Sequence, residues 1–198
     1  MRNRFAICLL LALTGPVAQA MAAEPVAAAN PEQPPILTPE ARLDTLFSDL
    51  KRERNEKAAE RVAARIQDEW GKSGSASVDL MMIWSKTAMD EQKFDAALDF
   101  LDQVVTLSPQ FAEGWNRRAT VHFMMRNYRK SMTDIDRTLQ LEPRHFGALS
   151  GLAQIMKDAG RKELALDAFQ RVLDIYPMMR SAQGEVASIS EELAGEGI

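Results

Sequence analysis

Three prolines recur at a fixed spacing along the second half of the chain. Pro109, Pro143 and Pro177 lie 34 residues apart, twice in succession, and a leucine or an isoleucine stands two residues before each of them. A proline lacks the backbone N–H and disfavours helical backbone in the residue before it, so each of these prolines predicts the end of a helix. A helix end that recurs with such a period predicts an array of stacked hairpins, because one hairpin alone cannot bury both of its faces.

Other residues fall into the same register. The positions twelve residues before each proline are small, and those eight residues before are bulky and apolar: Ala97, Ser131, Ala165, and Leu101, Ile135, Phe169. A second set of small residues recurs earlier in each period: Ser85, Ala119, Ala153. Small residues let two antiparallel helices approach closely, and the bulky neighbours fill the remaining space. The pattern therefore predicts an all-α fold of antiparallel helical hairpins.

This register resembles the tetratricopeptide repeat (TPR) family over residues 78–177. The chain also resembles secreted TPR proteins of alphaproteobacteria, partly through the segment 112–119. Arg118 and His122 depart from the pattern, since the family usually has an apolar residue and an aromatic residue there. The resemblance implies a TPR-type α-solenoid with repeats at 78–111, 112–145 and 146–179.

Two further helical segments flank these repeats. Residues 40–71 keep the spacing of small residues but lack the closing proline, so they predict an atypical N-terminal hairpin that caps the array. Residues 180–194 carry a single apolar stripe, which is typical of the C-terminal capping helix that such arrays need. The Gly- and Ser-rich segment 71–75 predicts a loop between the first hairpin and the repeats.

The first 20 residues have the pattern of an export signal. Arg2 and Arg4 precede an unbroken apolar run at 5–13, and Ala18-Gln19-Ala20 offers small residues at the positions that signal peptidase reads. The apolar run is shorter than the roughly 20 residues that a membrane-spanning helix needs. We expect a cleavable signal peptide at 1–20, a periplasmic or secreted protein and no permanent membrane span after cleavage. An uncleaved anchor is the alternative, and the site of cleavage stays open.

Residues 21–39 contain five of the nine prolines, which predicts a flexible Pro/Ala-rich linker. Cys8, the one cysteine, lies inside the predicted signal, so the exported chain would have no thiol, disulfide or Cys-based metal site. The net charge of −4 gives no basic excess for phosphates, and we expect no nucleic-acid partner.

The composition offers little for catalysis or metal binding. His122 and His145 are the two histidines of the chain, too few for a zinc site of three or four ligands. Neither histidine has a serine and an acid at spacings that would assemble a nucleophile. We therefore expect no metal, no cofactor and no enzymatic activity.

In the TPR family the first helix of each repeat lines a concave surface that binds a partner. Carried over residue by residue, the resemblance implies thirteen partner-binding positions: Asp79, Met82, Lys86, Met89, Glu113, Asn116, Arg117, Thr120, Phe123, Met124, Ser150, Gln154 and Lys157. The carboxylate clamp of the chaperone-tail binders is absent, because Met82, Gly147 and Gly151 stand where its basic residues would be.

These residues imply a periplasmic protein–protein interaction scaffold that binds a peptide or helix of an envelope partner in the concave groove. The alternatives are an accessory subunit or weak enzyme of cell-wall metabolism, and a self-assembling repeat protein. Homo-oligomerisation stays open.

Overall fold

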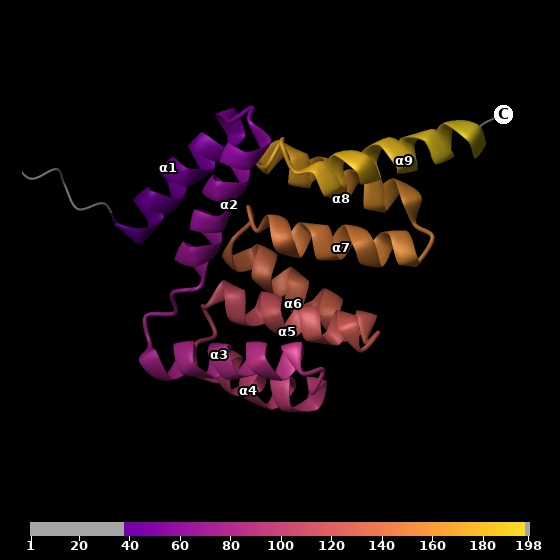
Figure 1. Cartoon of the computed structure of the whole chain (residues 1–198). Coiled ribbons are helices and arrows are strands. Elements are labelled where there is room, and N and C mark those ends of the chain that lie inside the picture. The colour runs from indigo at the N-terminus through magenta and orange to yellow at the C-terminus, as the bar shows by residue number, and fades with distance from the viewer. Residues whose placement is uncertain (1–37, 197–198) are drawn as a thin grey trace, which may run out of the picture. The chain divides into compact units, whose positions relative to one another are not determined.

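The computed structural model of the protein describes residues 38–196, which form nine α-helices and no strand (Figure 1). The helices are α1 (Pro39–Arg52), α2 (Glu56–Trp70), α3 (Ala76–Asp90), α4 (Phe94–Leu107), α5 (Ala112–Met124), α6 (Tyr128–Leu141), α7 (Phe146–Asp158), α8 (Lys162–Ile175) and α9 (Arg180–Glu196). The predicted all-helical fold is confirmed. The predicted signal peptide and nearly all of the predicted linker lie outside the described residues.

Helices α3–α4, α5–α6 and α7–α8 form three successive hairpins, and α9 packs on α8. The small residues of the register lie at the seams of these hairpins: Ala97 and Ala165 are fully buried, and Ser131 donates its hydroxyl hydrogen to the carbonyl oxygen of Ala119 at 2.9 Å. Close backbone approach at these positions lets the larger apolar side chains interdigitate.

A left-handed residue stands in the turn of each of the three repeats, at positions that are again 34 residues apart. Gln92 and Arg126 have φ values of 59° and 58°, and Gly160 has a φ of 70°. This conformation lets the backbone N–H groups after each first helix cap its last carbonyl oxygens. Only the third repeat has glycine at this position. In the first two repeats Gln92 and Arg126 adopt the left-handed conformation, which is unfavourable for a residue that has a Cβ atom.

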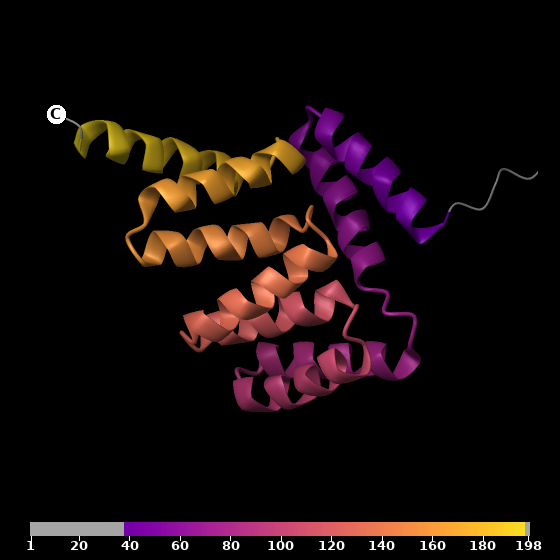
Figure 2. The same cartoon turned by 180° about the vertical axis from the view of Figure 1, so that it is seen from behind.

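The first hairpin, α1–α2, packs against the third repeat. Its buried residues share one core with α7, α8 and α9, among them Leu46, Phe47, Leu50, Ala63, Ile66, Trp70, Phe146, Leu149, Phe169, Val172 and Ile189. Arg144 and Asp44 form an ion pair at 2.7 Å, and Arg180 and Glu56 form another at 3.0 Å. Figures 1 and 2 both show α2 running across the ends of the repeat helices, from α8 toward α3. The hairpin is therefore not stacked on the first repeat, as a cap of the array would be.

Arg118 and His122, the two departures from the family pattern, lie beside a buried acid. Two nitrogens of Arg118 donate to the two carboxylate oxygens of Asp134 at 2.7 and 2.8 Å, and the Asp134 side chain is only 3% exposed. The two hydrogen bonds neutralise the charges of Arg118 and Asp134 at a position between the two helices of the repeat. The family pattern usually has an apolar residue in place of Arg118.

Within residues 38–196, no helix combines the length and the apolar character needed to cross a membrane.

Candidate functional site

A small groove lies between the first helices of the second and third repeats. It has a volume of about 120 Å³ and is lined by residues of α5, α6 and α7: Asn116, Ala119, Thr120, Phe123, Ser131, Ile135, Gly147, Ala148 and Gly151. We call it the α5–α7 groove. Its floor is apolar and includes Ile135, while Asn116 and Thr120 provide polar groups at the edge.

A larger and more polar cavity adjoins this groove, where the end of α2 crosses the starts of α5 and α7. It has a volume of about 450 Å³, and its lining residues are Gln67, Asp68, Trp70, Gly71, Lys72, Glu113, Asn116, Arg117, His145, Phe146 and Gly147. We call it the α2 cavity. Asn116 and Gly147 line both hollows, so the two are neighbours.

Glu113 organises the polar wall of the α2 cavity. Its carboxylate accepts hydrogen bonds from Arg117 at 3.0 Å, from Asn116 at 3.0 Å and from Nε2 of His145 at 3.2 Å. Burial alone would raise the pKa of Glu113, but the hydrogen bond from His145 and the nearby positive charges outweigh it and hold this pKa below its usual value. Glu113 is therefore a fixed anion of the site.

His145 joins this wall to the start of α7. Its Nδ1 accepts the backbone N–H of Ala148 at 3.1 Å, so the ring proton lies on Nε2 and is donated to Glu113. The His145 ring stacks on Trp70, with centroids 4.1 Å apart and planes at 8°. His145 thus caps α7, holds Glu113 and anchors α2 at the same time.

The open space of the α5–α7 groove depends on two glycines of α7. A Cβ at Gly147 would come within 3.4 Å of the His145 ring, and a Cβ at Gly151 within 3.5 Å of Ile135 Cδ1. Both are ordinary contact distances, and neither glycine has a positive φ. Packing therefore does not require glycine at these positions, although glycine lowers helix stability.

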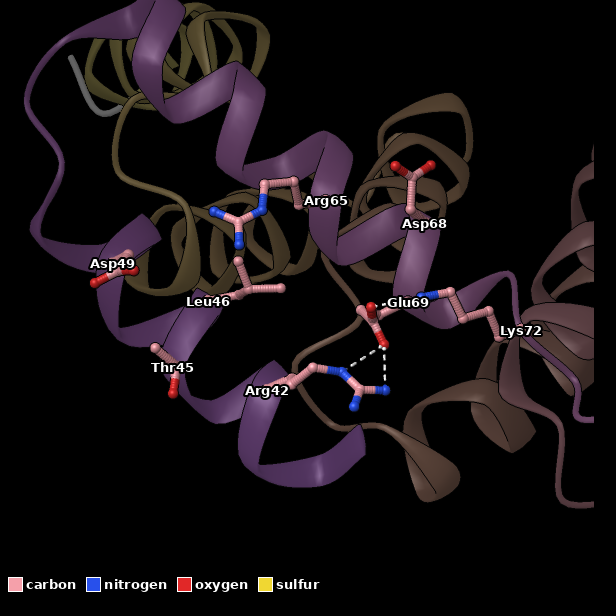
Figure 3. Close-up of a pocket in the computed structure, with 8 residues that line it drawn as sticks. All are labelled: Arg42, Thr45, Leu46, Asp49, Arg65, Asp68, Glu69 and Lys72. Carbon is pink, nitrogen blue, oxygen red and sulfur yellow. Dashed lines mark hydrogen bonds and ion pairs between the residues drawn. The ribbon is translucent and has the colours of Figure 1, made fainter. Parts of the chain in front are cut away.

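A third hollow, of about 330 Å³, lies between α1 and α2 (Figure 3). Arg42 of α1 donates to Glu69 of α2 at 3.1 and 3.3 Å, and Lys72 pairs with the same carboxylate at 2.6 Å. These contacts, Lys72 first, lower the pKa of Glu69. The side chains around this hollow include both signs of charge, and we assign the Glu69 pairs to holding α1 against α2.

The two neighbouring hollows are lined by five of the thirteen predicted partner-binding residues, all of them on α5: Glu113, Asn116, Arg117, Thr120 and Phe123. The other eight do not line either hollow. Met124 is exposed on the outside of the groove, with 47% of its surface accessible.

On α3, the predicted partner-binding residue Met82 is buried. Its side chain is only 5% exposed and belongs to the core between α3, α4 and α5, because this position faces the neighbouring repeat. Met89 packs against the same core, Lys86 forms an ion pair with Asp90 at 2.6 Å, and Asp79 accepts hydrogen bonds from Ser73 in the preceding loop.

On α7, the predicted residues bond to neighbouring helical groups. Ser150 donates to the carbonyl oxygen of Phe146, Gln154 donates to Asp158, and Lys157 pairs with Glu185 of α9 at 2.5 Å.

The repeat register did not indicate the contribution of α2, which supplies Gln67, Asp68 and Trp70 to the cavity, with Lys72 following in the loop. These residues precede the first repeat, so the 34-residue spacing cannot show that they lie near α5 and α7. The one sequence feature at this place is Trp70 immediately before Gly71, and it predicts only the end of a helix.

Two buried side-chain nitrogens in the described chain have no hydrogen-bond partner, Nε1 of Trp70 and Nδ1 of His122. Among residues 38–196 there is no group of three or more His, Cys, Asp or Glu side chains that could hold a metal ion.

Stacked hairpins with a groove between their first helices define a helical-repeat solenoid. A TPR repeat-containing protein of Rhizobium etli is 53% identical to this chain over 158 residues, which cover 80% of this chain and 78% of that protein. The chain therefore belongs to the TPR repeat-containing proteins. No protein-family model matches the chain.

Two solved TPR domains share the fold at lower identity. The first TPR domain of Spaghetti (RPAP3), bound to HSP90 peptide SRMEEVD, is 21% identical with a TM-score of 0.58 and covers 61% of this chain and 95% of that one. The TPR2B domain of yeast Sti1, in a pHsp70 complex, is 13% identical with a TM-score of 0.55 and covers 60% of this chain and 99% of that one. No catalytic family is indicated by these relatives.

Proposed function

We propose that this protein is a periplasmic interaction scaffold that binds an extended peptide segment of an envelope protein in the α5–α7 groove and the α2 cavity. The observation that carries the proposal is that the two hollows are neighbours, with Asn116 and Gly147 in the lining of both. The peptide complexes of the similar TPR domains support this mode of binding.

The dimensions of the groove favour an extended peptide over a helix. Its volume of about 120 Å³ is roughly four times the share of one liquid water molecule, so it takes a single apolar side chain. A helix is about 10 Å across and does not enter such a groove. One apolar anchor against Phe123 and Ile135, with polar contacts to Asn116 and Thr120, fits peptide recognition in which apolar anchors supply affinity.

The wall of the α2 cavity favours an internal segment over a free C-terminus. Glu113 is a fixed anion there, and the two cations of the lining are already in ion pairs, Arg117 with Glu113 at 3.0 Å and Lys72 with Glu69 at 2.6 Å. Neither cation is thus left for a terminal carboxylate. Asn116 and Gln67 provide amide groups that can pair with a peptide backbone. The bound segment would thus place a side chain in the groove and its neutral backbone along the cavity wall.

Peptide display on the purified protein would test the groove. We expect the selected peptides to share an apolar residue and to lose at least tenfold in affinity, by fluorescence anisotropy, for Gly151→Leu. Gly184→Leu on α9 is the matched control, because a side chain there has open space and no contact with the groove. Equal affinity for both variants would exclude the α5–α7 groove as the site.

The proposed periplasmic location depends on the signal pattern of residues 1–20, and it is tested separately. We expect a fusion of residues 1–37 to alkaline phosphatase to be active outside the inner membrane, and N-terminal sequencing to find the signal removed. An inactive fusion, or a chain that starts at Met1, would contradict this part of the proposal.

A further inference from the structure

The first repeat presents an apolar face that the described part of the chain does not cover. Leu80, Ile83 and Trp84 of α3 are 42%, 61% and 46% exposed, and they form the densest group of exposed large apolar residues in the described chain. Beside them is an apolar hollow of about 380 Å³ between α3 and α4, lined by Trp84, Thr87, Ala88, Glu91, Lys93, Ala96 and Phe100. Trp84 and Phe100 are in ring contact, with centroids 5.5 Å apart.

The position of this face explains its exposure. The two ends of a repeat array need an element with a polar outer surface. At the C-terminal end α9 fulfils this need, because it buries Ala182 and Ile189 against the array and exposes Ser188 and Glu191. At the other end, no element among residues 38–196 covers α3 and α4 in this way, since the preceding hairpin shares its core with α7–α9 instead.

We propose that this face binds the same face of a second copy of the chain, so that the protein forms a two-fold symmetric dimer through α3. Exposed Leu80 lies one turn before Trp84 and Ile83 lies directly before it, while Thr87, which lines the hollow together with Trp84, lies about one turn after it. Antiparallel pairing of two α3 helices about Trp84 places Leu80 of each copy over the hollow of the other, as a two-fold interface requires.

The charges around the face also match a second copy. Lys86 pairs with Asp90 at 2.6 Å, and Lys93 pairs with Glu91 at 2.8 Å, so the rim holds two cations and two anions. A balanced rim of both signs is compatible with its own copy in antiparallel pairing. It has no basic excess that would attract a nucleic acid or an anionic lipid surface.

Head-to-tail assembly of two copies would bury less of the apolar surface of this face. The opposite end of the array exposes mainly polar and small side chains of α9, and no large apolar residue of α9 is exposed to receive Ile83 or Trp84. The geometry therefore points to a closed dimer and not to a filament.

Sedimentation equilibrium of the full chain over a hundredfold range of concentration tests the proposal. We expect a monomer–dimer equilibrium that Ile83→Glu weakens at least tenfold, with Leu80→Glu as a second variant. Both positions are exposed, so circular dichroism should show an unchanged helical content. Leu164→Glu on α8 is the matched control: Leu164 is 51% exposed but lies away from the face, and this variant should dimerise normally.

Cysteine cross-linking tests the symmetry. In a Cys8→Ser background, Thr87→Cys places one thiol on each copy about one turn from the proposed two-fold axis, too far apart for a direct disulfide, and a short bis-maleimide cross-linker should yield a covalent dimer. Thr106→Cys is the control, because both threonines are exposed and bond to the carbonyl oxygen four residues earlier.

Three results would overturn the inference. They are a monomer at every concentration, equal dimerisation of the Ile83→Glu and Leu164→Glu proteins, or cross-linking of the Thr87→Cys protein that is no faster than that of the Thr106→Cys protein. A monomer that instead binds an unrelated protein through Ile83 would overturn it too. None of these results bears on peptide binding in the α5–α7 groove.

Discussion

Individual glycines of the array serve two different purposes. A Cβ on Gly114 would lie 2.7 Å from Val104 Cγ1 and 3.2 Å from Phe111 Cδ1, so α4 and α5 can approach only because this residue has no side chain. A Cβ on Gly151 would meet Ile135 at 3.5 Å, an ordinary contact. The first glycine is required by packing, whereas the second keeps the groove open.

Because of this contrast, we expect alanine to change the free energy of unfolding in opposite directions at Gly114 and at Gly151. Gly114→Ala should lower the free energy of unfolding by about 1–3 kcal/mol, the usual effect of overpacking a core. Gly151→Ala should raise it by about 0.5–1 kcal/mol, because alanine favours helix over glycine. Urea denaturation of the two variants measures these changes. A change of the same sign in the free energy of unfolding of both would contradict the different roles of the two glycines.

His122 makes stability depend on pH near neutrality. Burial lowers the pKa of His122 below 6.5, mainly by disfavouring the charged ring, and its Nδ1 has no partner. Between the folded and the unfolded pKa values, the unfolded chain binds a proton and the folded chain does not, so stability falls as pH falls below about 6.5. Above that range this contribution is fully retained.

We expect His122→Phe to reduce the stability lost between about pH 7 and pH 5, since phenylalanine does not titrate. Chemical denaturation of both proteins across this range is the measurement. The lowered pKa of Glu113 acts in the more acidic range below 4.5, so the two effects separate. An identical pH profile for the variant would show that His122 is not responsible.

Among the elements outside the repeats, α2 contributes directly to the candidate site. Trp70, at its last position, is 7% exposed and contacts Phe47, His145 and Phe146 through ring interactions. Removing this ring should both loosen the first hairpin and unstack His145 from the wall of the α2 cavity.

We expect Trp70→Ala to lower the free energy of unfolding by about 3–5 kcal/mol, the usual cost of a large-to-small change in a core. Limited proteolysis should then cut faster in the loop at 71–75. Trp84→Ala is the control, because Trp84 is 46% exposed and its removal leaves no comparable cavity. Equal cleavage of both proteins would contradict the role of Trp70 as the anchor of α2.

The helices of the repeats could be predicted from sequence because their signals are local: small residues at the seams and a proline after each second helix. The place of α1–α2 could not, because it depends on contacts such as Asp44–Arg144 and Glu56–Arg180, 100 and 124 residues apart along the chain. Five of the thirteen positions that the register predicts for partner binding line the two hollows, all of them on α5. The burial of Met82 could not be predicted from the register, because a position in the repeat does not tell whether the neighbouring repeat covers it.

For the whole molecule, the shared core predicts which helices unfold together. In a simple solenoid each repeat is stabilised by its neighbours in sequence. Here α1–α2 share a core with α7–α9, while α3–α4 belong to a different core with part of α5. We therefore expect matched amide hydrogen-exchange protection in α1–α2 and α7–α8 and a separate level in α3–α4.

Exchange measured by mass spectrometry on two core variants checks this expectation. Trp70→Ala should reduce protection in α7–α8 more than in α3–α4, and Leu101→Ala should do the reverse, since Leu101 is buried in the other core. Equal loss in all helices of both variants would mean that the molecule unfolds as one unit.

The return of the first hairpin to the third repeat also sets the order in which the chain can fold. A TPR array with only local contacts has a low contact order and can complete each repeat as it leaves the ribosome. In this protein Leu46 and Ile66 belong to the same core as Val172 and Ile189, so this core can be completed only after those C-terminal residues have been synthesised. The N-terminal hairpin must therefore wait, with its apolar face exposed, through the synthesis of most of the chain, which makes it the segment that most needs protection from premature association during biogenesis.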